Sequence, residues 1–285
     1  MKIAVIGTGV MGSGMAEGLL KAGQDVVVYN RTAAKTEHLV SMGAKASASV
    51  SSAISSADAV IIVLLDAATV KSTLQQPDVK VSLRGKMILN ATTTNFTEIA
   101  EIVEIVRGAG GKPAECSISG GAQDLKDRKC DFLLASESGD QEFWTSVLKN
   151  VGGNISYVGE VGRATMAESP MIFGSMFLSA AAAYSVAVGL KLNVPHDVIK
   201  SQLAVFGPAL EPLVDNMLSR NYDTVMASVD SFLGACQTGV STAKQLNMPT
   251  AVLENIASLF AEAKQDGLGP KDGTVIMEML LKQGK

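Results

Sequence analysis

Short apolar runs alternate with segments of helical periodicity through the first half of the chain. Strands that alternate with helices in this way predict a parallel sheet with crossover helices on both faces. We therefore expect a doubly wound α/β domain. The apolar runs lie at residues 2–6, 25–29, 57–65, 86–90, 112–116 and 132–135, and the helical segments lie near 15–20, 32–42, 67–74, 97–108 and 141–151.

The pattern changes near residues 159–162, and everything beyond them is typical of helices. Residues 175–192 are rich in Ala, Met and Leu and hold hardly a charge. Because a helix that is apolar on nearly all sides must be buried on nearly all sides, we expect a second subunit to cover it. Burial between the chain's own two domains is the alternative. The pattern predicts an α/β domain at 1–162, an interdomain helix at 163–192 and an all-α domain at 193–285 that forms an intertwined homodimer.

Composition narrows the class of protein further. The 285 residues carry a net charge of −4, and the scattered Lys and Arg argue against binding to nucleic acid or to an anionic membrane. The cysteines, at 116, 130 and 236, have no C-x-x-C spacing and indicate free thiols in a reducing compartment. No apolar run reaches the ~18 residues of a membrane span, and the first strand begins at Lys2. We expect a cytoplasmic, soluble enzyme without a metal site.

The first apolar run leads directly into a G-x-G-x-x-G sequence at residues 7–12, which opens a helix-like stretch. This context is typical of dinucleotide binding in a Rossmann-type fold. Gly7 permits the tight turn, Gly9 lets the backbone approach a pyrophosphate, and Gly12 lets the helix pack closely on the strand. A side chain at Gly9 is expected to obstruct binding.

The end of the second apolar run indicates which dinucleotide binds. An NAD enzyme typically has Asp or Glu there, whereas this chain has Asn30, Arg31 and Thr32, with Lys35 a helical turn later. A guanidinium, an ammonium and a hydroxyl suit a 2′-phosphate, so we predict NADPH over NADH. The alternative is an ordinary solvated basic helix start.

With these motifs, the whole chain resembles the β-hydroxyacid dehydrogenase superfamily, which includes 3-hydroxyisobutyrate dehydrogenase, the imine reductases and the reductive aminases. Residues 64–66 with Val70 resemble the family's loop along the cofactor, residues 90–93 its loop near the nicotinamide, and 267–269 with Asp272 its carboxy-terminal signature. The resemblance implies the same fold and an NADPH site. Its residues would be Gly7, Thr8, Gly9, Val10, Met11, Gly12, Asn30, Arg31, Thr32, Lys35, Leu64, Leu65, Asp66, Val70, Thr92 and Thr93.

Two motifs separate the branches of the superfamily. Residues 115–121 resemble the D-x-P-V-S-G-G segment that holds a substrate carboxylate in hydroxyacid dehydrogenases. The dehydrogenases then carry G-x-G-x-x-x-K-x-x-x-N, and alignment on Gly162 puts Glu168 at the Lys position and Ile172 at the Asn position. Imine reductases instead carry G-x-A followed by an acidic or tyrosyl residue, which residues 162–168 resemble. The resemblance implies Glu168 as the catalytic residue and Ser117, Ser119, Gly120, Met171, Ile172 and Tyr184 as substrate-binding residues.

The chemistry of Glu168 favours a cationic or neutral substrate. Desolvation raises the pKa of a carboxyl in an apolar cleft, so it can carry a proton, and its ionised form stabilises an iminium. Two negative charges about 4 Å apart cost roughly 4 kcal/mol at an effective dielectric near 20, which disfavours a hydroxy acid. We expect an NADPH-dependent imine reductase or reductive aminase that acts on a small imine, ketone with amine, or carbonyl compound. The alternatives are a reductase of small aldehydes or keto acids that uses Ser119 and bound water, and a non-catalytic NADPH-binding protein.

Pro170 affects where Glu168 points. Proline fits best in a first helical turn, which predicts Ser169 as the N-cap and Pro170 as the first helical residue. Glu168 would then lie just outside the helix.

Overall fold

The structure is a computed structural model, and it describes residues 1–282. Contacts divide the chain into two compact units, one of Met1–Glu168 and one that begins at Ser169. The division falls within a single long helix, α9 (Arg163–Lys191), near its start. Each unit has a hydrophobic core of its own.

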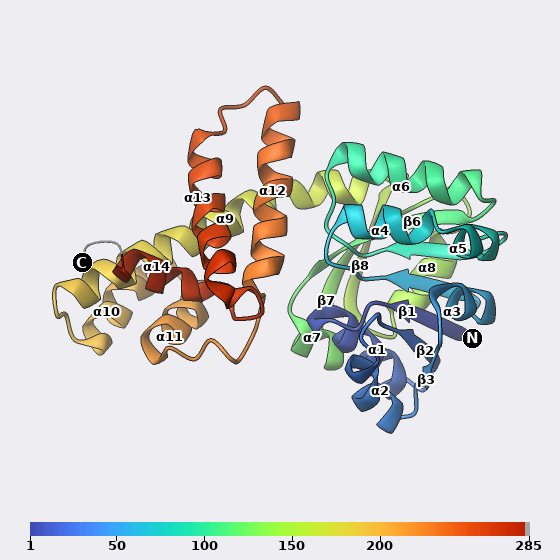
Figure 1. Cartoon of the computed structure of the whole chain (residues 1–285), viewed down its shortest axis with the longest axis horizontal. Coiled ribbons are helices and arrows are strands. Elements are labelled where there is room, and N and C mark those ends of the chain that lie inside the picture. The colour runs from blue at the N-terminus through green and yellow to red at the C-terminus, as the bar shows by residue number, and fades with distance from the viewer. Residues whose placement is uncertain (283–285) are drawn as a thin grey trace. The chain divides into compact units, whose positions relative to one another are not determined.

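The first unit is built around one sheet, which has eight strands within the described residues (Figure 1). Their order is β3-β2-β1-β4-β5-β6-β7-β8, and every pair from β3 to β6 is parallel. Because β1 lies between β2 and β4, the connections leave it in both directions, and ligands bind at such a switch point in α/β sheets. The strands are β1 (Lys2–Ile6), β2 (Asp25–Tyr29), β3 (Lys45–Ala46), β4 (Ala59–Ile62), β5 (Met87–Asn90), β6 (Lys112–Ser119), β7 (Cys130–Ser136) and β8 (Gly152–Gly159).

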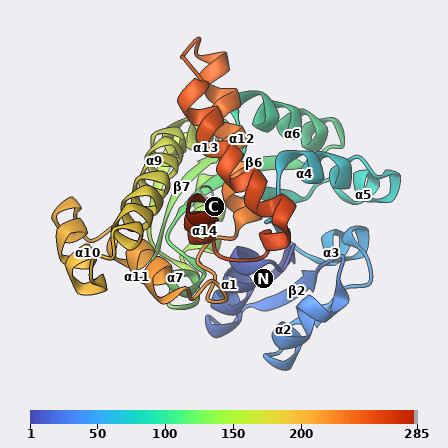
Figure 2. The same cartoon turned by 60° about the vertical axis from the view of Figure 1, so that its left-hand side comes forward.

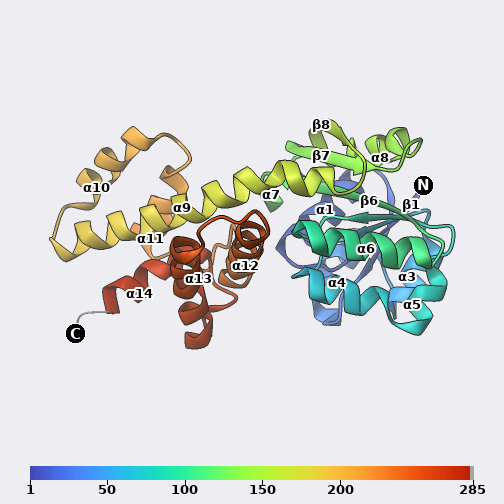
Figure 3. The same ribbon diagram turned by 90° about the horizontal axis from the view of Figure 1, so that it is seen from above.

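The apolar strands are buried on both faces, which explains their uninterrupted hydrophobic sequence. Ile3 and Val5 of β1 belong to one core cluster, and Ala4 and Ile6 belong to the other. Figure 3 shows α4 and α6 side by side on one face. The helices on that face are α3 (Val50–Ser56), α4 (Ala67–Leu74), α5 (Pro77–Ser82) and α6 (Phe96–Gly108). The core cluster on the other face includes residues of α1 (Val10–Lys21), α2 (Glu37–Ser41), α7 (Ala122–Lys126) and α8 (Gln141–Leu148). A 3₁₀ turn, η1 (Ala33–Thr36), precedes α2.

The sheet departs from the expected parallel order at β7, which runs antiparallel to β6. Only residues 120–129 connect the two strands, and a parallel return needs a crossover of about a dozen residues or more. The chain therefore turns back, and β8 then pairs parallel with β7. The sequence analysis missed β3, which has two exposed residues, and β8, which begins with two glycines and has no buried residue.

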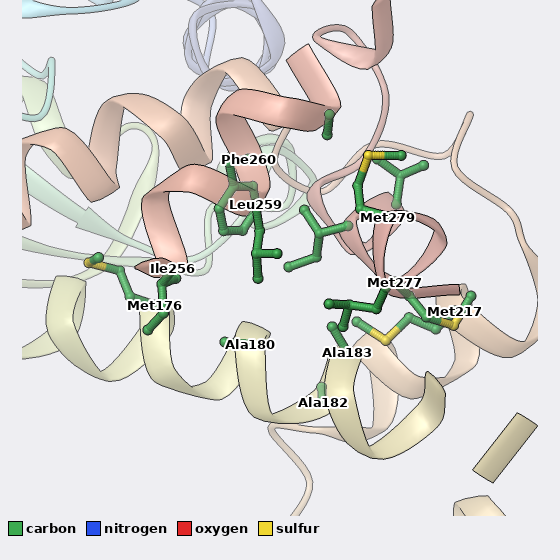
Figure 4. Close-up of a cluster of buried hydrophobic side chains, with 14 of the residues drawn as sticks. Met176, Ala180, Ala182, Ala183, Met217, Ile256, Leu259, Phe260, Met277 and Met279 are labelled. Carbon is green, nitrogen blue, oxygen red and sulfur yellow. The ribbon is translucent and has the colours of Figure 1, made fainter. Parts of the chain in front are cut away.

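The second unit is helical (Figures 1 and 2), and α12 and α13 lie side by side in it. Four buried methionines, Met176, Met217, Met277 and Met279, fill its core together with Phe260 (Figure 4). These methionines are core residues. The elements after α9 are α10 (His196–Leu203), η2 (Ala204–Phe206), α11 (Glu211–Ser219), α12 (Val229–Gln245), α13 (Ala251–Ala263), η3 (Lys264–Leu268), η4 (Gly273–Val275) and α14 (Ile276–Lys282).

The α9 helix is long and apolar enough, by length and composition, to cross a membrane, with a mean hydropathy of 1.7 in its most apolar stretch. The sequence analysis expected no such segment, because Ser and Gly interrupt the apolar run, although they add no charge. Of that stretch, 44% is buried inside the protein, and Met176, Ala183 and Val186 pack in the helical core. One part of α9 therefore belongs to the core of the helical unit.

Candidate cofactor and active site

The glycine-rich turn has no room for side chains at two of its glycines. Gly7 has a φ of +97°, and a Cβ there would lie 2.1 Å from the Val63 carbonyl oxygen. A Cβ on Gly12 would lie 1.9 Å from the Gly7 carbonyl oxygen. Gly7 thus permits the turn and Gly12 permits the close approach of α1, which agrees with the roles predicted for them.

Gly9 differs from both, because a Cβ there would meet nothing within 4 Å. It immediately precedes α1, and no side chain caps the start of that helix. The first N–H groups of α1 are therefore left for a ligand, and the helix dipole favours an anion at this end. The open space and these N–H groups fit the pyrophosphate of a dinucleotide.

Two short polar side chains hold the loop after β2 beside this turn. The Thr8 N–H donates to Asn30 Oδ1 at 3.2 Å, and the Thr8 hydroxyl donates to the Lys35 carbonyl oxygen at 3.0 Å. Asn30 Nδ2 donates to the Thr32 carbonyl oxygen at 3.1 Å. The structure thus gives Thr8 and Asn30, both predicted to bind the cofactor, a role in positioning the two loops.

The cationic side chains after β2 are turned to solvent. Arg31, Thr32 and Lys35 are all exposed, and within residues 1–282 neither Arg31 nor Lys35 pairs with a carboxylate. Val10 is 43% exposed at the start of α1, and Met11 is half-buried. A guanidinium, a hydroxyl and an ammonium are therefore available on the loop that Asn30 fixes next to the glycine-rich turn.

The loops after β4 and β5 are joined to each other at the same edge of the sheet. The Leu64 N–H donates to Thr92 Oγ1 at 2.9 Å, and Asn90 Nδ2 donates to the Thr92 carbonyl oxygen at 2.9 Å. Thr92 is buried by these contacts. Leu65, 54% exposed, and the half-buried Thr93 remain at the surface of the joined loops.

Asp66 and Val70, predicted on the loop along the cofactor, have structural contacts instead. Asp66 Oδ1 accepts the Thr69 N–H at 2.7 Å and so caps α4. Val70 is fully buried in the core beneath that helix. The structure therefore gives Asp66 a capping role and Val70 a packing role.

A buried carboxylate on β6 accepts hydrogen bonds from the start of α9. Glu115 Oε1 accepts the N–H of Gly162 at 2.5 Å and of Ala164 at 2.9 Å. Thr165 donates its N–H to Oε1 at 3.4 Å and its hydroxyl to Oε2 at 2.7 Å. A buried charge is costly unless hydrogen-bonded, and here four donors and a helix N-terminus stabilise it. Glu115 thus fastens the first turn of α9 to the sheet.

This contact corrects the predicted start of the helix. The prediction of Ser169 as N-cap and Pro170 as first helical residue is wrong, because α9 begins at Arg163 and continues through Pro170. Glu115 accepts the first N–H groups, so the helix starts earlier, and the proline removes only one later N–H. Glu168 consequently lies within the helix, not before it.

Glu168 is half-buried on α9 and lies beside Ser117 of β6. Burial raises the pKa of Glu168, the neighbouring Ser117 side chain lowers it in part, and the charge of Glu115 raises it again. Within the described residues the buried Ser117 hydroxyl has no hydrogen-bond partner of its own. Burial and these two carboxylates also raise the pKa of the Cys116 thiol, which therefore stays neutral. Within residues 1–282 no Lys, Arg or His pairs with Glu168. The site therefore holds two carboxyl groups whose pKa values are both raised.

Ser119 is the last residue of β6 and Gly120 follows it, and both lie at the surface. Both are exposed, and Gly120 has a φ of +134°. A Cβ on Gly120 would lie 2.7 Å from Cys130 Sγ, so this position requires glycine for its backbone shape. The Ser119 hydroxyl is the exposed polar group of the segment, whereas Ser117 is buried beside Glu168.

Three predicted substrate-binding residues lie in the helical unit. Met171 and Tyr184 are 46% and 54% exposed, and Ile172 is only 6% exposed within the helical core. Ile172 thus has a packing role there. The part of Met171 and Tyr184 in substrate binding stays a prediction.

Sequence reasoning missed the polar network beneath the site. The hydroxyls of Thr94 and Thr165 lie 3.1 Å apart, both buried, and Thr165 donates onward to Glu115. An acidic residue in an otherwise buried strand was the available signal, since such a charge requires partners. Within residues 1–282, no group of three His, Cys, Asp or Glu side chains is placed to hold a metal ion.

Comparison with known proteins shows to which family the chain belongs. The family model for the NAD binding domain of 6-phosphogluconate dehydrogenase matches residues 2–159, more than half of the chain. The structure of 3-hydroxyisobutyrate dehydrogenase from Salmonella typhimurium matches with a TM-score of 0.85 and 21% identity, over 98% of this chain and 99% of that one. The chain belongs to the β-hydroxyacid dehydrogenase superfamily. It is an NAD(P)-dependent oxidoreductase of that superfamily, with the Rossmann-type fold predicted from its sequence.

Several branches of the superfamily are similar to this chain. Glyoxylate/succinic semialdehyde reductase 2 of Arabidopsis thaliana is 29% identical over 98% of this chain and 79% of its own length. The cytokine-like nuclear factor N-PAC of Gallus gallus is 27% identical over 92% of this chain, which spans about half (48%) of that protein. An imine reductase from Myxococcus stipitatus, in complex with NADP⁺, has a TM-score of 0.67 and 25% identity over 98% of this chain and all of its own.

Proposed function

We propose that this superfamily member reduces C=N bonds with NADPH, with Glu168 as the proton donor and iminium stabiliser. The observation that carries the proposal is the half-buried Glu168 carboxyl beside Ser117 and Glu115, at the position where hydroxyacid dehydrogenases have a lysine. The likeness to an imine reductase supports it.

The geometry of Glu168 suits both steps of imine reduction. Since burial raises its pKa, the carboxyl keeps a proton to higher pH than an ordinary glutamate and can donate that proton to the nitrogen of a neutral imine. The carboxylate left behind then stabilises the iminium until a hydride adds to its carbon and gives the neutral amine. The proton and the hydride together account for the two hydrogens of the product.

NADPH fits the residues at the carboxyl ends of β1 and β2, and when bound it supplies the hydride. The α1 N–H groups and the space at Gly9 would hold the pyrophosphate. Arg31, Thr32 and Lys35 would hold the 2′-phosphate, with no carboxylate among them. A related imine reductase is known with NADP⁺ and a variant of it with NAD⁺, so the preference rests on these side chains.

Arg31→Ala tests the cofactor preference. We expect the Kd for NADPH to rise by about ten- to a hundredfold, since a hydrogen bond to a charged group contributes about 1.5–3 kcal/mol. The Kd for NADH, which has no 2′-phosphate, should not change. Fluorescence titration with both nucleotides measures this, with Arg84→Ala, an exposed arginine before β5, as the matched control. An equal loss for both nucleotides contradicts the assignment.

The experiment that tests the reaction is NADPH oxidation with a cyclic imine such as 2-methyl-1-pyrroline. Succinic semialdehyde, and 3-hydroxyisobutyrate with NADP⁺, are measured in parallel. Turnover of the imine alone, or far above the others, supports the proposal. Turnover confined to the carbonyl or hydroxyacid compounds refutes it.

A second candidate is the reduction of small aldehydes or keto acids. The relative named glyoxylate/succinic semialdehyde reductase supports this reaction, and so does the exposed Ser119 hydroxyl at the end of β6. Ser119 with a bound water would then face the carbonyl oxygen.

The third candidate is a non-catalytic NADPH-binding protein. The relative that is named a nuclear factor supports it, and tight NADPH binding without turnover of any of the three substrates would favour it.

We also propose a cytoplasmic homodimer that contacts neither membrane nor nucleic acid. The net charge of −4 and the free, buried cysteines support this environment. The exposed face of α9 supports the dimer, because Met171, Phe177, Tyr184 and Val188 are each 46–54% exposed along it. Phe177, Tyr184 and Val188 are seven and four residues apart, so they form one apolar stripe, and Met171, six residues before Phe177, lies to one side of it.

Phe177→Glu tests the dimer. A charge in place of this aromatic residue of the stripe should raise the dissociation constant of the dimer by at least about a hundredfold, since aromatic residues are among those that contribute most to interfaces. Sedimentation velocity across a concentration series measures the change. Val81→Glu, at an equally apolar position that is 78% exposed on α5, is the control and should leave the dimer intact. A dimer that is unaffected by Phe177→Glu places the interface elsewhere.

A further inference from the structure

We propose that Glu115 is a positioning residue that decides which of two neighbouring carboxyl groups carries the proton. By remaining ionised at the start of α9, it keeps the proton on Glu168, where a substrate can take it. This inference rests on the proposed role of Glu168 as proton donor.

The contacts of Glu115 select its ionised form. Both of its oxygens accept, from the N–H groups of Gly162, Ala164 and Thr165 and from the Thr165 hydroxyl. The three N–H groups on Oε1 cannot accept, so a protonated carboxyl could donate only from Oε2 to the Thr165 hydroxyl, which would then have to turn its own proton away. The Thr94 hydroxyl, 3.1 Å from that of Thr165, completes a chain of hydroxyls that ends at the carboxylate.

The surroundings of Glu168 select its protonated form. Burial and the negative charge of Glu115 disfavour a second charge at this carboxyl, and only the neighbouring Ser117 side chain lowers its pKa. The pKa of Glu115 is raised on balance by burial, against which its four donors act. Because Glu168 has no comparable set of donors, we infer that the first proton to bind the pair goes to Glu168.

Other ionisable groups nearby do not disturb this order. On β6, the Cys116 thiol is fully buried and neutral. On α9, Arg163 is exposed, and within residues 1–282 it pairs with neither carboxylate. When the pair carries a single negative charge, the hydrogen bonds that fasten α9 to the sheet therefore determine where that charge lies.

Infrared difference spectroscopy tests the inference on the whole protein without any substrate. The C=O stretch of a protonated carboxyl is followed against pH in wild type, Glu168→Gln and Glu115→Gln. We expect a band in wild type that persists above the titration of ordinary glutamates and is absent from Glu168→Gln. In Glu115→Gln the same band should remain, with its midpoint lower by about one pH unit or more, because a like charge has been removed.

A band that disappears in Glu115→Gln, or a midpoint that does not move, overturns the inference. NADPH binding and thermal unfolding show whether Glu115→Gln folds. If it does not fold, Thr165→Val tests the same inference. That variant removes one donor to Glu115, so a second band, that of Glu115, should persist to higher pH than in wild type, and Thr165→Ser should restore the wild-type spectrum. No change in Thr165→Val likewise overturns it.

The test separates this inference from the proposed function. If the bands behave as expected but the enzyme turns over no imine, the function fails while the distribution of charge stands. If Glu168→Gln abolishes imine turnover but Glu115→Gln leaves both the band and the pH profile unchanged, only the role of Glu115 fails.

Discussion

Replacing Glu168 by glutamine is expected to lower kcat for a cyclic imine by about 10²–10⁴-fold, the usual contribution of a positioned general acid. The amide keeps the size and burial of the side chain but can neither give up a proton nor balance an iminium charge. The Kd for NADPH should not change. Stopped-flow measurement of single turnovers separates the chemical step from product release.

The pH profile distinguishes the proton donor from a mere packing residue. Since the pKa of Glu168 is raised, the wild-type rate should be fully present below that pKa and fall as pH rises through it. Glu168→Gln should lose this limb of the profile. Glu160→Gln, the same change at an exposed glutamate just before α9, is the control and should retain both rate and profile. Full imine turnover in Glu168→Gln would remove Glu168 from the mechanism.

Alanine at Gly12 should have the largest effect on the folded protein. The added Cβ would lie 1.9 Å from the Gly7 carbonyl oxygen, so the turn must shift, at a cost of about 3 kcal/mol or more in the free energy of unfolding. At about 2–4 °C per kcal/mol, the Tm should fall by roughly 6–12 °C. NADPH binding should be lost with the turn, and calorimetry with nucleotide titration measures both.

Alanine at Gly9 makes the informative contrast. A Cβ there meets no protein atom within 4 Å, so the Tm without nucleotide should be unchanged while NADPH binding weakens. Gly108→Ala is the control, because that exposed glycine ends α6 with equally open space and should affect neither quantity. Unchanged NADPH affinity in Gly9→Ala would place the pyrophosphate elsewhere.

The fold could be predicted from sequence where burial leaves a pattern. The strands β1, β2, β4 and β5 are apolar on both faces, so their runs are visible without any tertiary knowledge. The reversal at β7 could not be predicted in the same way, since it depends on the length of one connection rather than on the apolar run itself. The edge strands β3 and β8 have no buried run to detect.

The site was predictable to the extent that its residues act through local backbone shape. The spacing of Gly7 and Gly12 in the sequence predicts their roles in the turn, and the structure shows that neither position has room for a side chain. Asn30 and Val70 carry the family pattern, but their contacts are with residues far along the chain, whereas Asp66 caps its own helix through Thr69. The start of α9 depended on Glu115, almost fifty residues earlier, which no helical periodicity could reveal.

Anchoring of the helix and the proposed reaction with substrate are assigned to different residues, Glu115 and Glu168, and this separation has an evolutionary consequence. The residue that anchors α9 belongs to the sheet, whereas the residue proposed to react with substrate belongs to the helix and supports none of the four anchoring hydrogen bonds. A lineage can therefore exchange the side chain at position 168 without losing the helix that presents it. The acid of the D-x-P-V-S-G-G-like segment persists here as Glu115 although the lysine of the hydroxyacid dehydrogenases does not. One anchored helix can thus serve as the shared platform on which different reductase chemistries diverge.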